Sequence, residues 1–94
     1  MINKSLLSKD KRCYFCGKTQ NLHFHHIFQN ANKKNSEKIG AWVWLCCEHH
    51  VLGKDAVHNN YQKNKELKQL AQQKYEENHT REEFMSIIKR NYLD

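Results

Sequence analysis

Two pairs of metal-ligating residues constrain this chain more than any other feature of its sequence. Cys13 and Cys16 form the first pair and Cys46 and His49 form the second, each with two residues between the ligands. Structural zinc takes four nitrogen or sulfur ligands in a tetrahedron, and pairs at this spacing are typical of such sites. A chain of 94 residues buries only a modest core, so a metal staple would contribute much of its stability. The sequence therefore predicts one structural Zn²⁺ held by Cys13, Cys16, Cys46 and His49.

The downstream pair has an alternative one residue later in the chain. Cys47 and His50 are also separated by two residues. We favour Cys46 with His49 because Leu45 and Cys46 end an apolar, strand-forming stretch, and because this choice leaves His50 available for another role. Four free buried cysteines are a weaker alternative, since unrelated cysteines rarely fall into two such pairs.

The bulk composition points to an anionic partner and to a reducing compartment. Lys and Arg number 16 against 10 Asp and Glu, which gives a net charge of +6 and a pI near 9.2. This balance favours nucleic acid as a partner, although a soluble lysine-rich protein would share it. Residues 1–12 lack the apolar run of a signal peptide, and no segment approaches the ~20 apolar residues of a membrane span. We therefore expect a cytoplasmic protein without membrane contact, whose cysteines bind metal rather than form disulfides.

The hydrophobic pattern predicts an α+β fold in a single domain, residues 1–94, with a metal-binding core at 13–58 and a helical extension at 61–92. Two strands are expected to pair, at residues 21–28 and 41–45, and the polar segment 29–38 between them is interpreted as a loop. Helices are expected at four places: one turn around Leu6 and Leu7, a short helix within 48–58, a long one over 61–77, and one that starts at the capping box Thr80–Glu83. The long helix should bury one face, made of Leu67, Leu70, Ala71 and Tyr75.

Histidines remain after the zinc ligands have been assigned. His25 and His26 stand side by side between the two ligand pairs, and His50 and His58 follow the second pair. Neutral imidazole can ligate a divalent metal or act as a general base near pH 7, and hydrolysis of a phosphodiester requires both roles. Neighbours in an extended strand point to opposite faces, so His25 and His26 can serve one site only where the strand ends or bulges. The polar, turn-prone sequence from Gln29 onward permits such an end.

The order Cys-x-x-Cys, His-His-Ile, Leu-Cys-x-x-His-His resembles that of the HNH (His-Me finger) endonucleases with a zinc-stapled ββα-metal fold. The match covers residues 13–58. The sequences Trp-Val-Trp-Leu-Cys and Ala-Val-His-Asn-Asn, with the Leu-Lys-x-x-Ala-Gln helix, also resemble short HNH-like proteins of phages and prophages, over much of residues 13–92.

This resemblance implies a DNA endonuclease in the cytoplasm of a bacterial host, with RNA as a further potential substrate. It implies that His26 is the general base and that His25 and His50 bind a catalytic Mg²⁺ or Mn²⁺. His58 would complete the metal shell or contact the scissile phosphate. A homodimer would allow such an enzyme to cut both strands.

The chain departs from the family pattern at one position. Many members carry an Asn a few residues before Leu-Cys, where it orients the base, and here that place holds Ala41. Asn59, Asn60 or the 30–36 segment could supply a substitute. The departure favours a second interpretation, a zinc-stapled accessory module that binds nucleic acid without cleaving it.

Overall fold

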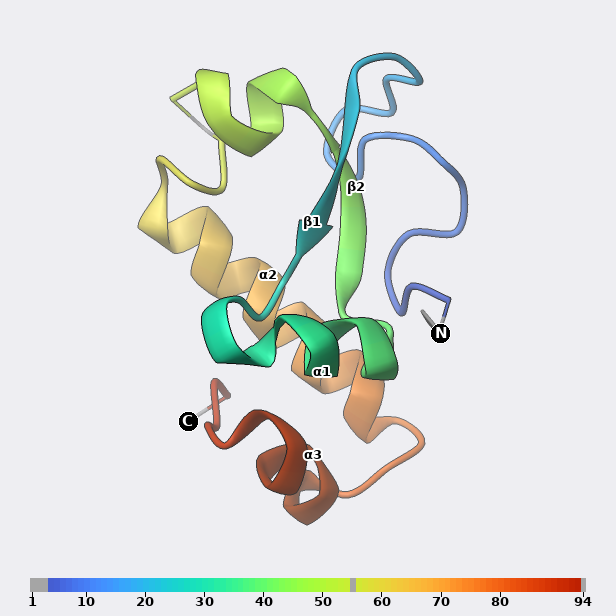
Figure 1. The fold of residues 1–94 in the computed structure, drawn as a ribbon, viewed down its shortest axis with the longest axis vertical. Coiled ribbons are helices and arrows are strands. Elements are labelled where there is room, and N and C mark those ends of the chain that lie inside the picture. The colour runs from blue at the N-terminus through green and yellow to red at the C-terminus, as the bar shows by residue number, and fades with distance from the viewer. Residues whose placement is uncertain (1–3, 55, 94) are drawn as a thin grey trace.

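The protein is a small mixed α+β structure (Figure 1). The computed structural model describes residues 4–54 and 56–93. Its elements follow in chain order: strand β1 (Leu22–His26), 3₁₀ turn η1 (Asn30–Asn32), helix α1 (Lys33–Ile39), strand β2 (Trp42–Cys46), π-helical turn η2 (Glu48–Leu52), helix α2 (Tyr61–Glu76) and helix α3 (Arg81–Ile88). In the part of the chain that is described, no helix is long and apolar enough to cross a membrane.

The two strands pair as expected, and the pairing is antiparallel, with Leu22 opposite Cys46 and His26 opposite Trp42. Alternation along each strand creates two faces. One face carries His25 and, opposite it, Val43, both almost fully buried. The other face is aromatic and half-buried: Phe24 stacks on Trp42 with ring centroids 4.6 Å apart.

The expected loop at residues 29–38 is wrong, because this segment folds into η1 and α1. Its hydroxyl and apolar residues Ser36 and Ile39 are buried, and Ser36 Oγ accepts a hydrogen bond from the Phe28 N–H at 3.1 Å and donates one to the Ala41 carbonyl. Gly40 ends the helix in the left-handed region at φ 79°, where glycine carries no steric penalty. The helix thus rests on tertiary contacts of a few residues rather than on an apolar stripe.

The expected turn of helix around Leu6 and Leu7 is also absent. Instead, backbone N–H groups of the N-terminal segment donate hydrogen bonds to β2 and to the turn that precedes it. Leu6 N–H donates to the Gly40 carbonyl at 2.8 Å, and Tyr14 N–H donates to the Trp44 carbonyl at 2.8 Å. Residues that satisfy their backbone groups along a strand edge cannot also form a helical turn.

Helix α2 agrees with the expected long helix to within one residue at its end, and it buries Leu67, Ala71 and Tyr75. Leu70 does not share that face, since it is 40% exposed. The buried stripe runs along i, i+4, i+8, and Leu70 lies to one side of it. The polar Gln72 is fully buried instead, on the side that meets the chain after α3.

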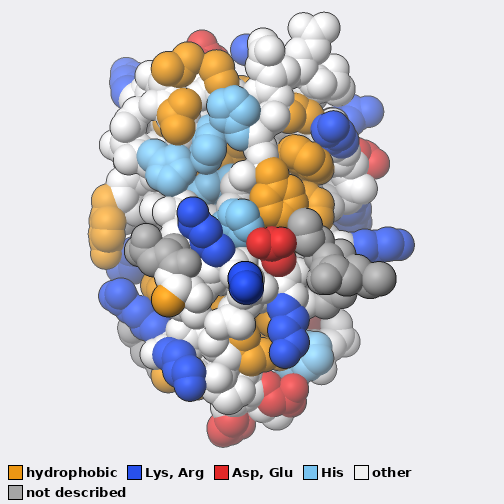
Figure 2. Space-filling view, in the orientation of Figure 1, with side chains coloured by type: hydrophobic (Ala, Val, Ile, Leu, Met, Phe, Trp, Pro, Cys, Tyr) orange, Lys and Arg blue, Asp and Glu red, His pale blue; other side chains and the backbone are white. Residues whose placement is uncertain are grey.

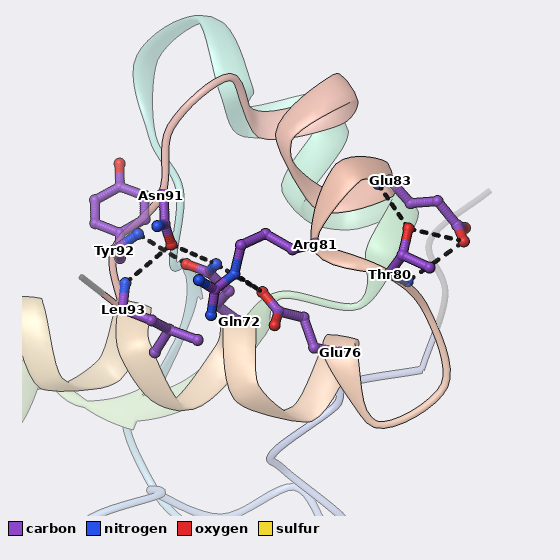
Figure 3. Close-up of polar contacts among 8 residues, drawn as sticks. All are labelled: Gln72, Glu76, Thr80, Arg81, Glu83, Asn91, Tyr92 and Leu93. Carbon is purple, nitrogen blue, oxygen red and sulfur yellow. Dashed lines mark hydrogen bonds and ion pairs between the residues drawn. The ribbon is translucent and has the colours of Figure 1, made fainter.

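Helix α3 begins at the expected capping box (Figure 3). Thr80 Oγ1 accepts from the Glu83 N–H at 3.1 Å, and the Glu83 carboxylate accepts from the Thr80 N–H at 3.3 Å. At the other end, the amides of Asn32 and Asn35 donate to the carbonyls of Ile88 and Ile87, at 3.0 and 3.1 Å. These bonds satisfy carbonyl groups that a helix end leaves open, and they join α1 to α3.

Candidate metal centres

The predicted zinc ligands come together. The sulfurs of Cys13, Cys16 and Cys46 and a ring nitrogen of His49 all lie within 4.8 Å of one another. Cys16 Sγ lies 3.7 Å from Cys46 Sγ, and His49 Nδ1 lies 3.6 and 3.2 Å from the sulfurs of Cys13 and Cys46. Ligands about 2.0–2.3 Å from a tetrahedral zinc would be roughly 3.3–3.8 Å apart. The group can therefore hold a metal ion such as zinc with little rearrangement.

Local structure explains why these four residues converge. Residues 13–18 form a tight turn in which Gly17, at φ 78°, donates its N–H to the Cys13 carbonyl at 2.8 Å. Cys46 ends β2. The turn η2 starts two residues later and brings His49 back toward the tight turn at residues 13–18. Cys47 lies outside the group, so the residues that converge are those of the favoured pair, Cys46 with His49.

The protonation of the cysteines also suits a metal. Burial raises the pKa of the Cys13 thiol, but hydrogen bonds with the backbone of Cys46, Cys16 and Phe15 outweigh it and lower the pKa to about 6. For Cys16 a backbone hydrogen bond at Lys18 lowers the pKa, yet burial and the neighbouring thiols raise it overall. Thiolates this close together would repel one another, and a cation among them would remove that repulsion.

A second group lies beside the first. Ring nitrogens of His25, His50 and His58 lie within 4.8 Å of one another, and we call these three residues the histidine cluster. His25 is 1% exposed and its Nε2 has no hydrogen-bond partner. His50 Nε2 and His58 Nε2 are 3.1 Å apart, close to the spacing of about 3–3.4 Å between two nitrogens on one ion. A buried nitrogen without a partner, next to two converging ones, fits a ligand set that a metal ion would complete.

Burial and mutual repulsion keep His25 and His50 neutral. Burial lowers the pKa of His25 to about 3, with the charges of His50 and His58 adding to the effect. Burial likewise lowers the pKa of His50 to about 4, with further contributions from His58 and His23. Neutral imidazole is the form that binds a metal, so these side chains are ready to ligate at neutral pH.

His23 also lies at this site, although it was not among the residues predicted from the sequence. Its Nδ1 lies 2.8 Å from His50 Nδ1. One of the two nitrogens must donate, and a proton on His50 Nδ1 leaves the His50 Nε2 lone pair facing His58. A hydrogen bond to the non-ligating nitrogen is the usual way in which a metal-binding histidine is oriented. The alternation that places residues 23 and 25 on one strand face was the available signal.

His26 points to the opposite face of β1 from His25, as strict alternation requires, and the strand has no bulge. Its Nε2 lies 2.9 Å from the Glu37 carboxylate of α1. Because β1 ends at His26, this side chain still reaches the rim of the cluster. A cavity of about 210 Å³ is lined by His26 and the three cluster histidines, together with Phe24, Gln29 and Lys33. Figure 2 shows histidine side chains gathered on this face, with Lys and Arg side chains below them.

The asparagines proposed to replace the family's middle Asn are engaged elsewhere. Asn59 donates to the carbonyls of Val51 and Gly53, at 2.6 and 3.1 Å, and so fixes the loop after η2. Asn60 caps α2 by accepting from the Lys63 N–H at 3.1 Å. The Asn32 and Asn35 amides contact α3. The side chain that does contact the proposed base is Glu37, in the segment expected to be a loop.

No known protein family, curated protein or solved structure matches this chain. The functional assignment therefore depends on the two groups of ligands and their surroundings.

Proposed function

We propose that the chain is a metal-dependent endonuclease of the HNH type, which hydrolyses phosphodiester bonds in DNA. One observation carries the proposal: the histidine cluster and a carboxylate-held His26 line the same cavity, beside a Cys₃His group that can hold zinc. Metal-assisted hydrolysis requires ligands for a metal ion and a separate base that activates water, and both are candidates here. Lys33 on the cavity wall and the net charge of +6 favour an anionic substrate.

The donor set of the cluster bears on which ion would fit. His25, His50 and His58 would hold it, and all three offer imidazole nitrogen. Mg²⁺ prefers oxygen ligands, whereas imidazole suits transition metals, and along the divalent series affinity rises from Mn²⁺ toward Ni²⁺ and Cu²⁺. The cluster therefore fits a transition metal better than Mg²⁺. Such an ion would supply positive charge at the scissile phosphate and its leaving oxygen.

His26 would take a proton from the attacking water. An ionised carboxylate only accepts hydrogen bonds, so the Nε2 that faces Glu37 carries the proton and Nδ1 keeps its lone pair. Glu37 would hold this tautomer and stabilise the imidazolium that forms, in the manner of the acidic member of a catalytic triad. Glu37 would thus take over the orienting role that the family gives to its middle Asn.

A plasmid-nicking assay tests the proposal. Zinc-loaded protein is incubated with supercoiled DNA, or with RNA, in the presence of Mg²⁺, Mn²⁺ or Ni²⁺. His26→Ala should reduce the rate by about 10²–10⁴-fold, the usual contribution of a general base, and Glu37→Gln should reduce it less. His79→Ala is the matched control, since His79 contacts the Glu83 carboxylate at 3.1 Å on the surface of α3. Equal rates for wild type and His26→Ala, or no cleavage of any substrate, would refute the enzyme.

Ala41 stands where many HNH proteins carry the Asn that orients the base. This difference favours one other function, a module of the same architecture that binds nucleic acid without cutting it. Ala41 is fully buried and offers only its backbone, whose carbonyl accepts from the Ile27 N–H at 3.0 Å. A binding module would slow the migration of DNA in a gel-shift assay without cleaving it. It would contain one zinc per chain and take up no second metal.

A further inference from the structure

A second cavity, of about 230 Å³, lies between the first half of α2 and the chain that follows α3. Tyr61, Asn64, Lys65 and Lys68 line one wall. Their spacing of three and four residues places them on one face of α2. The other wall carries Arg90 and Tyr92. None of these six residues belongs to either metal centre.

Hydrogen bonds of Gln72 join the second wall of this cavity to α2 (Figure 3). The fully buried Gln72 donates to Asn91 Oδ1 at 2.8 Å and accepts from the Tyr92 N–H at 2.8 Å. Gln69 donates to the Tyr92 carbonyl at 2.9 Å. The chain can return toward α2 because Lys89 turns it in the left-handed region, at φ 72°. Hydrogen bonds therefore fix the second wall, residues 90–92, to α2.

The charges in this cavity are of one sign. Lys68 Nζ lies 5.4 Å from the centre of the Tyr92 ring, and the Arg90 guanidinium lies 5.1 Å from the same centre. Within residues 4–54 and 56–93, no ion pair is formed by Lys65, Lys68 or Arg90. Burial and the Arg90 charge both lower the pKa of Lys68. Cations gathered around one ring repel each other, and an anion between them would relieve that repulsion.

Two further features suit more than a bare anion. Asn64 Oδ1 is buried without a hydrogen-bond partner, so it lacks a donor that a sugar hydroxyl or a base N–H could provide. Tyr61 is 78% exposed, and its ring is free to stack on a base. The cavity volume is below the roughly 300–1,000 Å³ of typical small-molecule pockets. It suits a phosphate with part of its sugar rather than a whole cofactor.

We propose that this cavity binds the phosphate group of a nucleotide, with Lys68 and Arg90 on the phosphate, Asn64 on a hydroxyl or N–H group, and Tyr61 against the base. The choice of ligand deepens the proposed function and rests on it. Tyr61 lines this cavity and follows His58 of the histidine cluster by three residues, so the two sites adjoin along the chain. A strand lying across the histidine cluster could therefore continue into this cavity, which would hold a neighbouring phosphate.

Binding measurements on the full zinc-loaded chain, without added second metal, test this site. The probes are a fluorescein-labelled single-stranded 12-nucleotide DNA, followed by anisotropy, and adenosine monophosphate, followed by calorimetry. The site variant is Lys68→Gln with Arg90→Gln. The control is Lys74→Gln with Arg12→Gln, which removes the same two charge types from residues paired with Glu77 and Asp10 on the surface.

The site variant should raise the Kd for the oligonucleotide by about tenfold or more, because its glutamines cannot form charged hydrogen bonds with a phosphate. It should also reduce the slope of log K against log salt by about 0.7 for each phosphate of the single strand that the protein no longer neutralises. Tyr61→Ala, at an exposed position where folding is not at stake, should raise the Kd about fivefold or more and leave the slope unchanged, since stacking releases no counterions.

The two probes distinguish the sources of the phosphate. Weaker binding of both, or of the oligonucleotide alone, assigns the cavity to a nucleic-acid strand, and weaker binding of the mononucleotide alone assigns it to a free nucleotide. Equal binding of both probes by the site variant and the control overturns the site. Cleavage is not a readout here, so an inactive wild type that binds through this cavity would refute the nuclease and leave the site standing.

Discussion

Acidification should destabilise the metal-free histidine cluster through His25. The pKa of this side chain is about 3 in the folded protein because of its burial, against 6.5 in an unfolded chain. Below pH 6.5 the unfolded chain therefore binds a proton that the folded chain rejects, and stability falls as the pH falls. Each pH unit in this range costs about 1.4 kcal/mol, so the loss between pH 7.5 and 5.5 is about 1.4 kcal/mol.

The comparison of wild type with His25→Leu isolates this effect. Leucine has no proton to bind and removes the unpartnered Nε2, so at pH 7.5 the variant should be at least as stable as wild type. The pKa of His50 is lowered by burial, His58 and His23, all of which the variant retains, so its contribution cancels in the difference. Urea unfolding of the zinc-loaded proteins, with zinc content measured at each pH, gives the two free energies. A difference that stays constant between pH 7.5 and 5.5 would refute the account of His25 as a buried neutral imidazole.

Three further results are expected. Cys46→Ser should abolish the cooperative unfolding transition seen by circular dichroism, because structural zinc contributes about 10–16 kcal/mol in small folds, whereas Cys47→Ser should retain both zinc and fold; equal loss in both variants would contradict the assigned ligand set. His50→Ala should keep one zinc per chain and lose a second transition metal by mass spectrometry or atomic absorption, and retention of both ions would exclude the histidine cluster as a metal site. Gly40→Ala should lower the free energy of unfolding more than Gly17→Ala. Both positions have φ near 78–79°, which costs an L residue about 1–2 kcal/mol, but of the two only Gly40 would place the new Cβ against a backbone carbonyl. Equal losses of unfolding free energy in urea titrations would contradict that close approach.

The parts of this structure that the sequence predicts are those that local rules determine. The ligands Cys13, Cys16, Cys46 and His49 follow from spacing, because a tight turn and a strand end each place two ligands within reach of one ion. The opposite directions of His25 and His26 follow from the two-residue period of a strand. The capping box and α2 follow from side chains close to them in sequence.

The parts that the sequence does not predict depend on distant contacts. Helix α1 has a polar sequence, and its support comes partly from the Asn32 and Asn35 amides on carbonyls of α3 more than fifty residues away. Gly40 was the local signal that a helix ends there. Glu37 could be linked to His26 only after α1 was placed across the end of β1. Glu37, the residue proposed to orient His26, is thus hidden for the same reason that its helix is hidden.

The two candidate metal centres share one turn of backbone, so we expect metal binding at one to depend on metal binding at the other. His49 and His50 are neighbours in η2, and their carbonyls accept from the N–H groups of Val57 and His58, at 2.8 and 3.4 Å. Loss of zinc from His49 would release this turn and separate His50 from His58. Because linkage is reciprocal, an ion in the histidine cluster must increase the retention of zinc by the same factor by which zinc increases the affinity of the cluster. Competition for zinc by a chromogenic chelator, with and without Ni²⁺, should therefore show protection in wild type and none in His50→Ala. Identical zinc loss in all four conditions would mean that the shared turn transmits nothing between the two centres.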